Sequence, residues 1–200
     1  MNRIISWTLI SIVAISSAAC GPKFEPIQVS PLVFPNTNIK GKISGDVLVS
    51  IADGAFTQRN YYTDHPNYAL PYALGNIDQE YVQAVAASVF QSYSFTKPVG
   101  SASKVGLRLQ GLSHSVLVDS TTSITPFVTD EFVARWVLVN QKGQLVLEFN
   151  ALGHASSSGS WGPKEIQEQA KIRTTNALID LHRSTIETLL ANRQVFVDME

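Results

Sequence analysis

The first twenty residues constrain this chain most, because they combine a lone positive charge, a short apolar run and the only cysteine. Arg3 is followed by an apolar run from Ile4 to Ile15, and the small residues Ser17-Ala18-Ala19 lead into Cys20. The run is too short for a stable membrane span, and small residues ahead of the cysteine suit a cleavage site. This layout predicts a bacterial secretory signal, removed as residues 1–19, and a lipid chain on Cys20.

Two alternatives to a lipoprotein stay open from these residues. Ser17 stands where such a signal usually carries leucine, so an ordinary secreted protein and a retained membrane anchor are the other outcomes. Gly21, and not aspartate, follows Cys20. Aspartate at that place marks retention in the inner membrane of enterobacteria, so we expect the outer membrane, with the folded domain in the periplasm of the cell envelope.

The length of 200 residues allows one domain, or one domain with a tail. We expect the signal peptide at 1–19, a lipidated cysteine with a proline-rich tether at 20–39, and a single α+β domain at 40–200. Proline removes amide donors and favours extended chain, so the tether is expected to be semi-rigid. Its apolar side chains would be unusual in a free linker, so we expect part of it to lie on the domain; they include Ile27, Val29, Leu32, Val33 and Phe34.

Composition and motifs exclude several kinds of function. With Cys20 lipidated no thiol is left for a disulfide, thiol catalysis or a zinc-thiolate site. The chain has 15 basic and 16 acidic residues, which gives no electrostatic reason to expect nucleic acid. A G-x-S-x-G elbow, a Walker A motif and a dinucleotide-binding glycine motif are all missing from the sequence. We therefore expect no cofactor and no enzyme, and a hydrolase is the least favoured alternative.

The histidines show no metal-ligand spacing, so no metal site is expected. There are four, and no pair among them has the H-x-x-x-H spacing: His65, His114, His154 and His182. His114 shares the inward phase of its predicted strand, so we expect it to be a hydrogen-bonded residue of the core or of the sheet edge. His182 is expected on the flank of a helix.

The sequence after the tether predicts a strand and then a helix. A half-buried strand is indicated by apolar residues at alternate positions, Ile43, Val47, Val49 and Ile51. Asp53-Gly54 is a turn signal, so Phe56 to Tyr62 is the candidate hairpin partner. A helix then begins at Asn76, which can cap it together with Gln79, and ends before Pro98. Its apolar face is formed by Tyr81, Val82, Val85, Ala86, Val89, Phe90 and Tyr93.

Three further strands are predicted in the second half of the chain. Lys104 to Asp119 has the pattern of a long strand whose apolar phase shifts at Gly111, which suggests a β-bulge. Glu131 to Asn140 and Gln144 to Ala155 are two more strands, joined by a tight hairpin at Asn140-Gln141-Lys142-Gly143.

The last predicted helix begins at Pro163, where the missing amide is harmless, and runs to about Asn192. Its apolar arc is broader than one sheet contact requires, so we expect burial on two sides, by the first helix or by a partner. The element order is therefore β(β)-α-β-β-β-α. This order predicts an α+β fold, a two-layer sandwich of a mainly antiparallel sheet with two amphipathic helices on one face.

The pattern resembles small bacterial envelope lipoproteins of the YajG type. The resemblance rests on the signal, the first helix, K-V-G-L-R-L-Q-G-L at Lys104 to Leu112, V-L-V-N-Q-K-G-Q-L-V-L at Val137 to Leu147, and the closing helix. It covers residues 43–190 through pattern more than through a diagnostic motif. The resemblance implies an outer-membrane lipoprotein without known catalysis, and it adds topology but little mechanism.

Tyr61 to Gly75 is predicted to be a loop rich in tyrosine, and it is the most informative feature outside the core. Tyrosine offers a flat apolar face and a polar tip, which suit contact with protein, glycan or lipid headgroups. The alternative is a loop that only covers the sheet edge. Tyr72 sits just before the first helix and is expected to pack, while Tyr68 is the better candidate for contact. The candidate partner contacts are Tyr61, Tyr62, Tyr68 and Tyr72.

These expectations combine into one main hypothesis and two alternatives. The main hypothesis is a binding or assembly accessory protein, held at the membrane by the lipid on Cys20 and contacting an envelope protein, a glycan or a lipid. The first alternative is a carrier that holds a lipid or another apolar ligand between sheet and helices. The second is a hydrolase that uses a histidine and a serine.

Overall fold

The computed structural model describes residues 24–29, 32–35, 41–62, 70–95, 105–119, 127–159 and 162–197. In chain order the elements are β1 (Ile27–Gln28), β2 (Ile43–Ile51), β3 (Asn60–Tyr62), β4 (Pro71–Ala73), α2 (Ile77–Val89), β5 (Phe90–Phe95), β6 (Gly106–Asp119), β7 (Phe127–Val139), β8 (Leu145–Ser158), α3 (Pro163–Ala191) and α4 (Arg193–Val197). They form a five-stranded sheet, a three-stranded sheet and two main helices.

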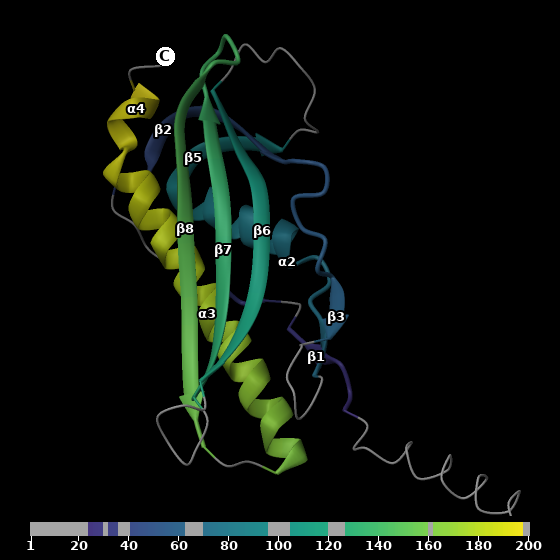
Figure 1. Ribbon diagram of the computed structural model, residues 1–200. Coiled ribbons are helices and arrows are strands. Elements are labelled where there is room, and N and C mark those ends of the chain that lie inside the picture. Colours follow the sequence, from purple (N-terminus) through teal and green to yellow (C-terminus); the bar gives the residue numbers. More distant parts are fainter. Residues whose placement is uncertain are drawn as a thin grey trace, which may run out of the picture.

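The larger sheet has the strand order β5-β2-β6-β7-β8. Long antiparallel ladders join β6 to β7 and β7 to β8, while β2 pairs in parallel with both β5 and β6 over shorter stretches. Figure 1 shows α2 and α3 on the same side of this sheet, with α3 running obliquely behind β7 and β8. The predicted α+β class, with a mainly antiparallel sheet and two helices on one face, is therefore confirmed.

The core lies between this sheet and the two helices. Strand β7 contributes alternate inward residues, and its largest is Trp136, which is fully buried. On β8 the helix comes so close that a Cβ atom at Gly153 would lie 2.2 Å from the carbonyl oxygen of Ala177. Glycine therefore lets α3 lie directly on the backbone of β8. Beyond α3, the short helix α4 packs on β2, and the ring of Phe196 lies 5.4 Å from that of Phe90.

Several local predictions are confirmed by the main chain. The register of β6 against β7 shifts between Leu109 and Gly111, which is the expected bulge. The hairpin between β7 and β8 closes through the amide of Asn140, which donates to the carbonyl oxygen of Gln144 at 3.0 Å. Gly143 in that hairpin has a φ of +75°, a conformation that favours glycine. Pro163 begins α3, as expected.

The first helix is shorter than predicted. It ends at Val89, and Phe90–Phe95 forms β5, so the expectation that Phe90 and Tyr93 lie on its helical face is wrong. The reason is the parallel pairing of this stretch with β2, a contact distant in sequence that overrides the local four-residue repeat. Asn76 does stand at the N-cap, but its side chain makes no cap hydrogen bond. Its Oδ1 accepts a hydrogen bond from Arg59 instead.

The expected hairpin between the first strand and Phe56 to Tyr62 is also wrong. Asn60–Tyr62 forms β3, which pairs antiparallel with β4, and β4 pairs in parallel with β1. Strands β3 and β4 fall within Tyr61 to Gly75 apart from Asn60, so the two ends of the predicted tyrosine-rich loop are paired strands. Ile27 and Val29 are buried, so part of the predicted tether does lie on the folded body.

The apolar arc of α3 is buried on two sides for much of its length, as expected. Ala177 and Leu181 are buried, and α3 packs on β7, β8 and α2. Thr185 joins α3 to α2 through the hydroxyl of Tyr81 at 2.5 Å. Ile172 departs from this pattern, because it is 44% exposed.

Candidate functional site

The structure describes only part of the predicted contact surface. Cys20 and Tyr68 lie outside the described residues. Tyr61 and Tyr62 form β3 through their main chain, and their side chains lie outside the described part of the chain. Tyr72 lies in β4 and is 1% exposed.

Tyr72 is a core residue and has no surface to offer a partner, so its place among the candidate contacts is corrected here. Its ring meets the ring of His114 edge-on at 5.2 Å, and its hydroxyl donates to Asp130 Oδ1 at 3.3 Å. Burial, followed by the nearby charge of Asp130, raises the pKa of Tyr72 well above its ordinary value. The tyrosine is therefore a neutral hydrogen-bond donor in the interior.

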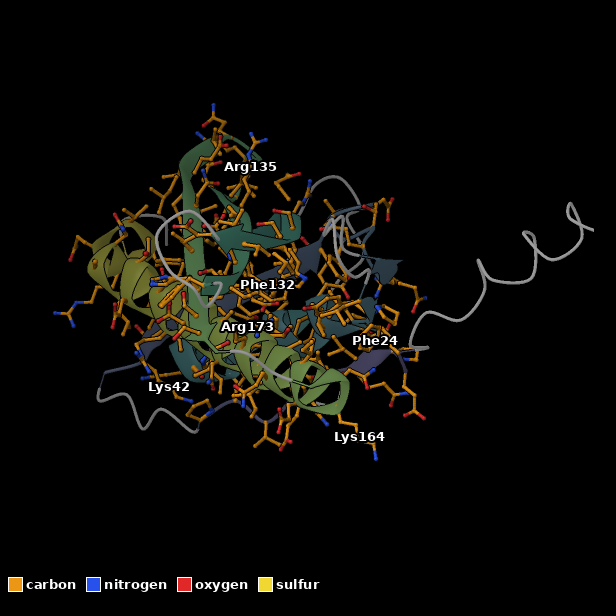
Figure 2. All side chains as sticks on the ribbon, turned by 60° about the horizontal axis from the view of Figure 1, so that its bottom comes forward. Phe24, Lys42, Phe132, Arg135, Lys164 and Arg173 are labelled. Carbon is orange, nitrogen blue, oxygen red and sulfur yellow. The ribbon has the colours of Figure 1, made fainter. Side chains whose placement is uncertain are left out.

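The acceptor of that hydrogen bond, Asp130, is the centre of a buried polar cluster. Its Oδ1 also lies 2.8 Å from His114 Nε2 and 2.9 Å from the hydroxyl of Thr174. Its Oδ2 accepts from Arg173 Nε at 2.8 Å. Figure 2 shows Arg173 on α3 in the interior near Phe132 of β7. We call these five side chains the Asp130 cluster: Tyr72, His114, Asp130, Arg173 and Thr174.

The cluster joins elements that are far apart in sequence. Arg173 also reaches β8, where its Nη1 donates to the hydroxyl of Ser157 at 2.9 Å. His114 stacks on Phe132, with ring centres 4.2 Å apart and an angle of 15° between the planes. The side chain of Gln58 pairs with the main chain of His114, donating at 3.0 Å and accepting at 2.8 Å. The cluster therefore ties α3, β4, β6, β7 and β8 to one carboxylate, and His114 is confirmed as a hydrogen-bonded core residue.

An aspartate beside a histidine is a pair that enzymes use for proton transfer, so its access matters. The side chains of His114 and Asp130 are 0% exposed, and that of Arg173 is 4% exposed. A general base must come within hydrogen-bond reach of a substrate proton. In this conformation the pair is enclosed by its own donors and by aromatic rings, so its geometry fits a structural role that locks the helix layer onto the sheet.

The sequence contains a signal for this cluster that pattern reading missed. Asp130 shares the inward phase of β7 with Val128 and Phe132, and a lone acidic residue at an inward position calls for a buried partner. Arg173 stands between Ala170 and Ala177 on the face of α3 that is buried. One buried acid and one buried base, on elements predicted to pack together, would have pointed to this pair.

A second buried cluster lies farther along α3. Trp136 Nε1 donates to the hydroxyl of Tyr81 at 3.1 Å. The hydroxyl of Thr185 donates to the carbonyl oxygen of Leu181 at 2.9 Å, so Tyr81 is the donor in its contact with Thr185. Burial raises the pKa of Tyr81 well above its ordinary value. These groups satisfy one another and bind α2 to α3 and β7.

His182 is buried at the α2–α3 contact and belongs to neither cluster. Its Nε2 lies 3.4 Å from the hydroxyl of Ser88, and the ring of Phe34 lies 4.7 Å from its own ring. Burial lowers the pKa of His182 below its ordinary value of 6.5, against a smaller opposing effect of a main-chain hydrogen bond at Ala84. The sequence predicts His182 on the flank of a helix, and the structure places it in the interior.

Across the part of the chain that the structure describes, His, Cys, Asp and Glu side chains nowhere gather in a group of three that could hold a metal ion. Among the described helices, none combines the length and the apolar character needed to cross a membrane.

No known protein-family model matches this sequence, and neither does any curated protein. The resemblance to lipoproteins of the YajG type therefore stays a prediction. Among solved structures, the chain is similar to a minor lipoprotein from Acinetobacter baumannii, with 11% identity, a TM-score of 0.46 and coverage of 74% of this chain and 94% of that one. It is also similar to a hypothetical protein from Chlamydia trachomatis, with 11% identity, a TM-score of 0.33 and coverage of 77% and 98%. Likenesses this distant establish neither a family nor a function for the present chain.

Proposed function

We propose that this protein is a lipid-anchored envelope protein that acts without catalysis, as a binding or assembly accessory protein. The observation that carries the proposal is the enclosure of the His114–Asp130 pair, because these two side chains, whose chemistry would suit proton transfer, serve packing. The layout of Met1 to Cys20 supports the anchor. Gly21 after the cysteine supports the outer membrane, with the folded part in the periplasm.

Part of the molecular surface remains available for a partner. The helices cover one face of the large sheet (Figure 1). The other face carries half-exposed apolar side chains on the long antiparallel strands. They are Leu117 at 53%, Phe127 at 47% and Leu152 at 46% exposed. Because Tyr72 is buried, the proposed contact in the tyrosine-rich segment rests on Tyr68, Tyr61 and Tyr62.

The carrier alternative has no observation in its favour. A lipid between sheet and helices would have to displace large side chains that fill this space and are fully buried, among them Trp136, Tyr81, Phe132 and Phe90. The hydrolase alternative lacks an accessible base at the Asp130 cluster. We therefore propose neither.

The test is crosslinking in whole envelopes followed by affinity capture with the lipid anchor intact. Tyr68→Ala should remove the crosslinks to a partner and leave the melting temperature unchanged. Tyr72→Ala should instead lower the free energy of unfolding by about 3–5 kcal/mol, as buried aromatic truncations do. Phe95→Ala, at a half-exposed ring of β5, is the matched control for the loss of any surface aromatic.

Two outcomes would count against the proposal. A shifted melting temperature in Tyr68→Ala with all crosslinks preserved would remove the tyrosine contact. Identical captures from the anchored protein and from Cys20→Ser would remove the accessory role at the membrane.

A further inference from the structure

The chain segment that follows the proposed lipid site is fastened to the folded body. We call its described residues, 24–29 and 32–35, the strap. Its strand β1 pairs in parallel with β4, with Ile27 opposite Tyr72, and Ile27 and Val29 are buried to 4% and 5% exposure. An apolar segment buried to this degree leaves the body only at the cost of exposing both side chains.

Further contacts fasten the strap at both ends. The carbonyl oxygen of Glu25 accepts from Gln167 Nε2 of α3 at 2.5 Å. The amide of Leu32 donates to Glu80 Oε2 of α2 at 2.7 Å, and Phe34 covers the buried ring of His182. The strap therefore touches β4, α2 and α3.

This attachment limits how far the body can lie from the lipid. Three residues separate Cys20 from Phe24, and an extended chain can span at most roughly 14 Å over that interval. If the strap were not attached and the body began at Gly41, an extended chain from Cys20 could span roughly 70 Å. We infer that the docked strap holds one end of the protein against the lipid headgroups, which rests on the proposed lipidation of Cys20.

The membrane-facing end is the one where β1 meets the first turns of α3. Figure 2, in which the lower end of Figure 1 comes forward, shows Phe24 beside β1 and Lys164 in the first turn of α3. Phe127 belongs to the same end, because it begins β7 and pairs with Ser158, where β8 ends before α3. Its half-exposed ring suits contact with the interfacial region of a bilayer.

The opposite end of the protein carries the hairpin between β7 and β8, with Lys142 at its tip. Strand β8 has 14 residues, so the two ends lie roughly 45 Å apart. This separation exceeds by a wide margin the longest distance that the chain from Cys20 to Phe24 can span. Lys142 is therefore held away from the membrane while Lys164 lies near it.

The test uses lipidated full-length protein in vesicles of phosphatidylethanolamine and phosphatidylglycerol that contain a headgroup nitroxide lipid. A single fluorophore is attached at Lys164→Cys or at Lys142→Cys, both exposed lysines, and Cys20 is blocked by its lipid. We expect fluorescence at position 164 to be quenched several-fold more than at position 142. A flexible insertion of glycine and serine between Lys23 and Phe24 lengthens the link between Cys20 and the strap without changing the strap, and it should remove this difference.

The outcomes distinguish a failure of the inferred orientation from a failure of the proposed function. Equal quenching at both positions in protein that carries its lipid would overturn the inference and leave the proposed function standing. Protein that carries no lipid and does not float with vesicles would overturn the proposed function, and the inference with it. A difference that survives the insertion would show that the strap does not set the orientation, and would also overturn the inference.

Discussion

At the scale of single residues, the carboxylate of Asp130 decides how the helix layer meets the sheet. A buried ion pair adds little net stability over an apolar pair of the same volume, because both charges lose their hydration. Removing one partner is different, since the other charge is left buried without compensation. Arg173 is 3% exposed, so it depends on Asp130 for compensation of its charge.

We predict that Asp130→Asn lowers the free energy of unfolding by about 3–5 kcal/mol, because Arg173 would keep its charge without a carboxylate. Urea unfolding followed by circular dichroism measures the change. Glu131→Gln is the matched control, because Glu131 is the next residue along β7 and its side chain faces the outer side of the sheet. This substitution should lower the free energy of unfolding by no more than about 0.5 kcal/mol. Equal midpoints for both variants would mean that the cluster does not stabilise the fold.

His182 predicts a dependence of stability on pH. Because burial lowers its pKa in the folded protein, the unfolded chain binds a proton at this site that the folded chain does not. The contribution of neutral His182 is therefore fully present above the unfolded value of about 6.5 and is lost as the pH falls below it.

The variant His182→Gln cannot titrate, so its free energy of unfolding should fall less steeply than that of the wild type between about pH 7.5 and 5.5. Urea titrations at several pH values measure the slope. Ser88→Ala removes the neighbouring hydroxyl but keeps the histidine, and should retain the wild-type slope. The same slope in His182→Gln and wild type would contradict the assignment.

At the scale of elements, the antiparallel half of the large sheet could be predicted from sequence because its signals are local. Alternation marks β6, β7 and β8, a phase shift marks the bulge at Gly111, and Asn140 to Gly143 marks the hairpin. Strand β5 could not be predicted, because Phe90 and Tyr93 continue the spacing of the helix before them. This stretch is extended because it pairs in parallel with β2, and a pairing between residues so far apart in sequence produces no pattern in the residues of β5 themselves.

The contact of α3 with β8 gives a prediction at the same scale. In Gly153→Ala the new Cβ would meet the backbone of α3 at 2.2 Å, so helix and strand must separate. Such overpacking costs about 1–3 kcal/mol, measured as a lower denaturation midpoint. Gly111→Ala is the matched control, because a Cβ there has no neighbour within 4 Å. Equal effects at the two glycines would contradict this close packing.

At the scale of the whole molecule, the strap and the small sheet connect the chain start to both helices. Strands of two or three residues carry no periodicity, so β1, β3 and β4 could not be predicted from sequence. The apolar character of Ile27 and Val29 predicted that part of the tether packs on the domain, but it could not predict which elements the tether contacts. The Asp130 cluster was missed for a similar reason, since its five members lie on four elements that are far apart in sequence.

The proposed function and the membrane-facing end of the protein both require the lipid at Cys20. The most direct measurement is metabolic labelling with palmitate, together with the mass of the mature N-terminus. We predict that the wild-type chain begins at a lipidated Cys20 and incorporates label, while Cys20→Ser stays uncleaved by the lipoprotein peptidase and unlabelled. A mature chain that begins elsewhere without lipid, or label that persists in Cys20→Ser, would contradict the account.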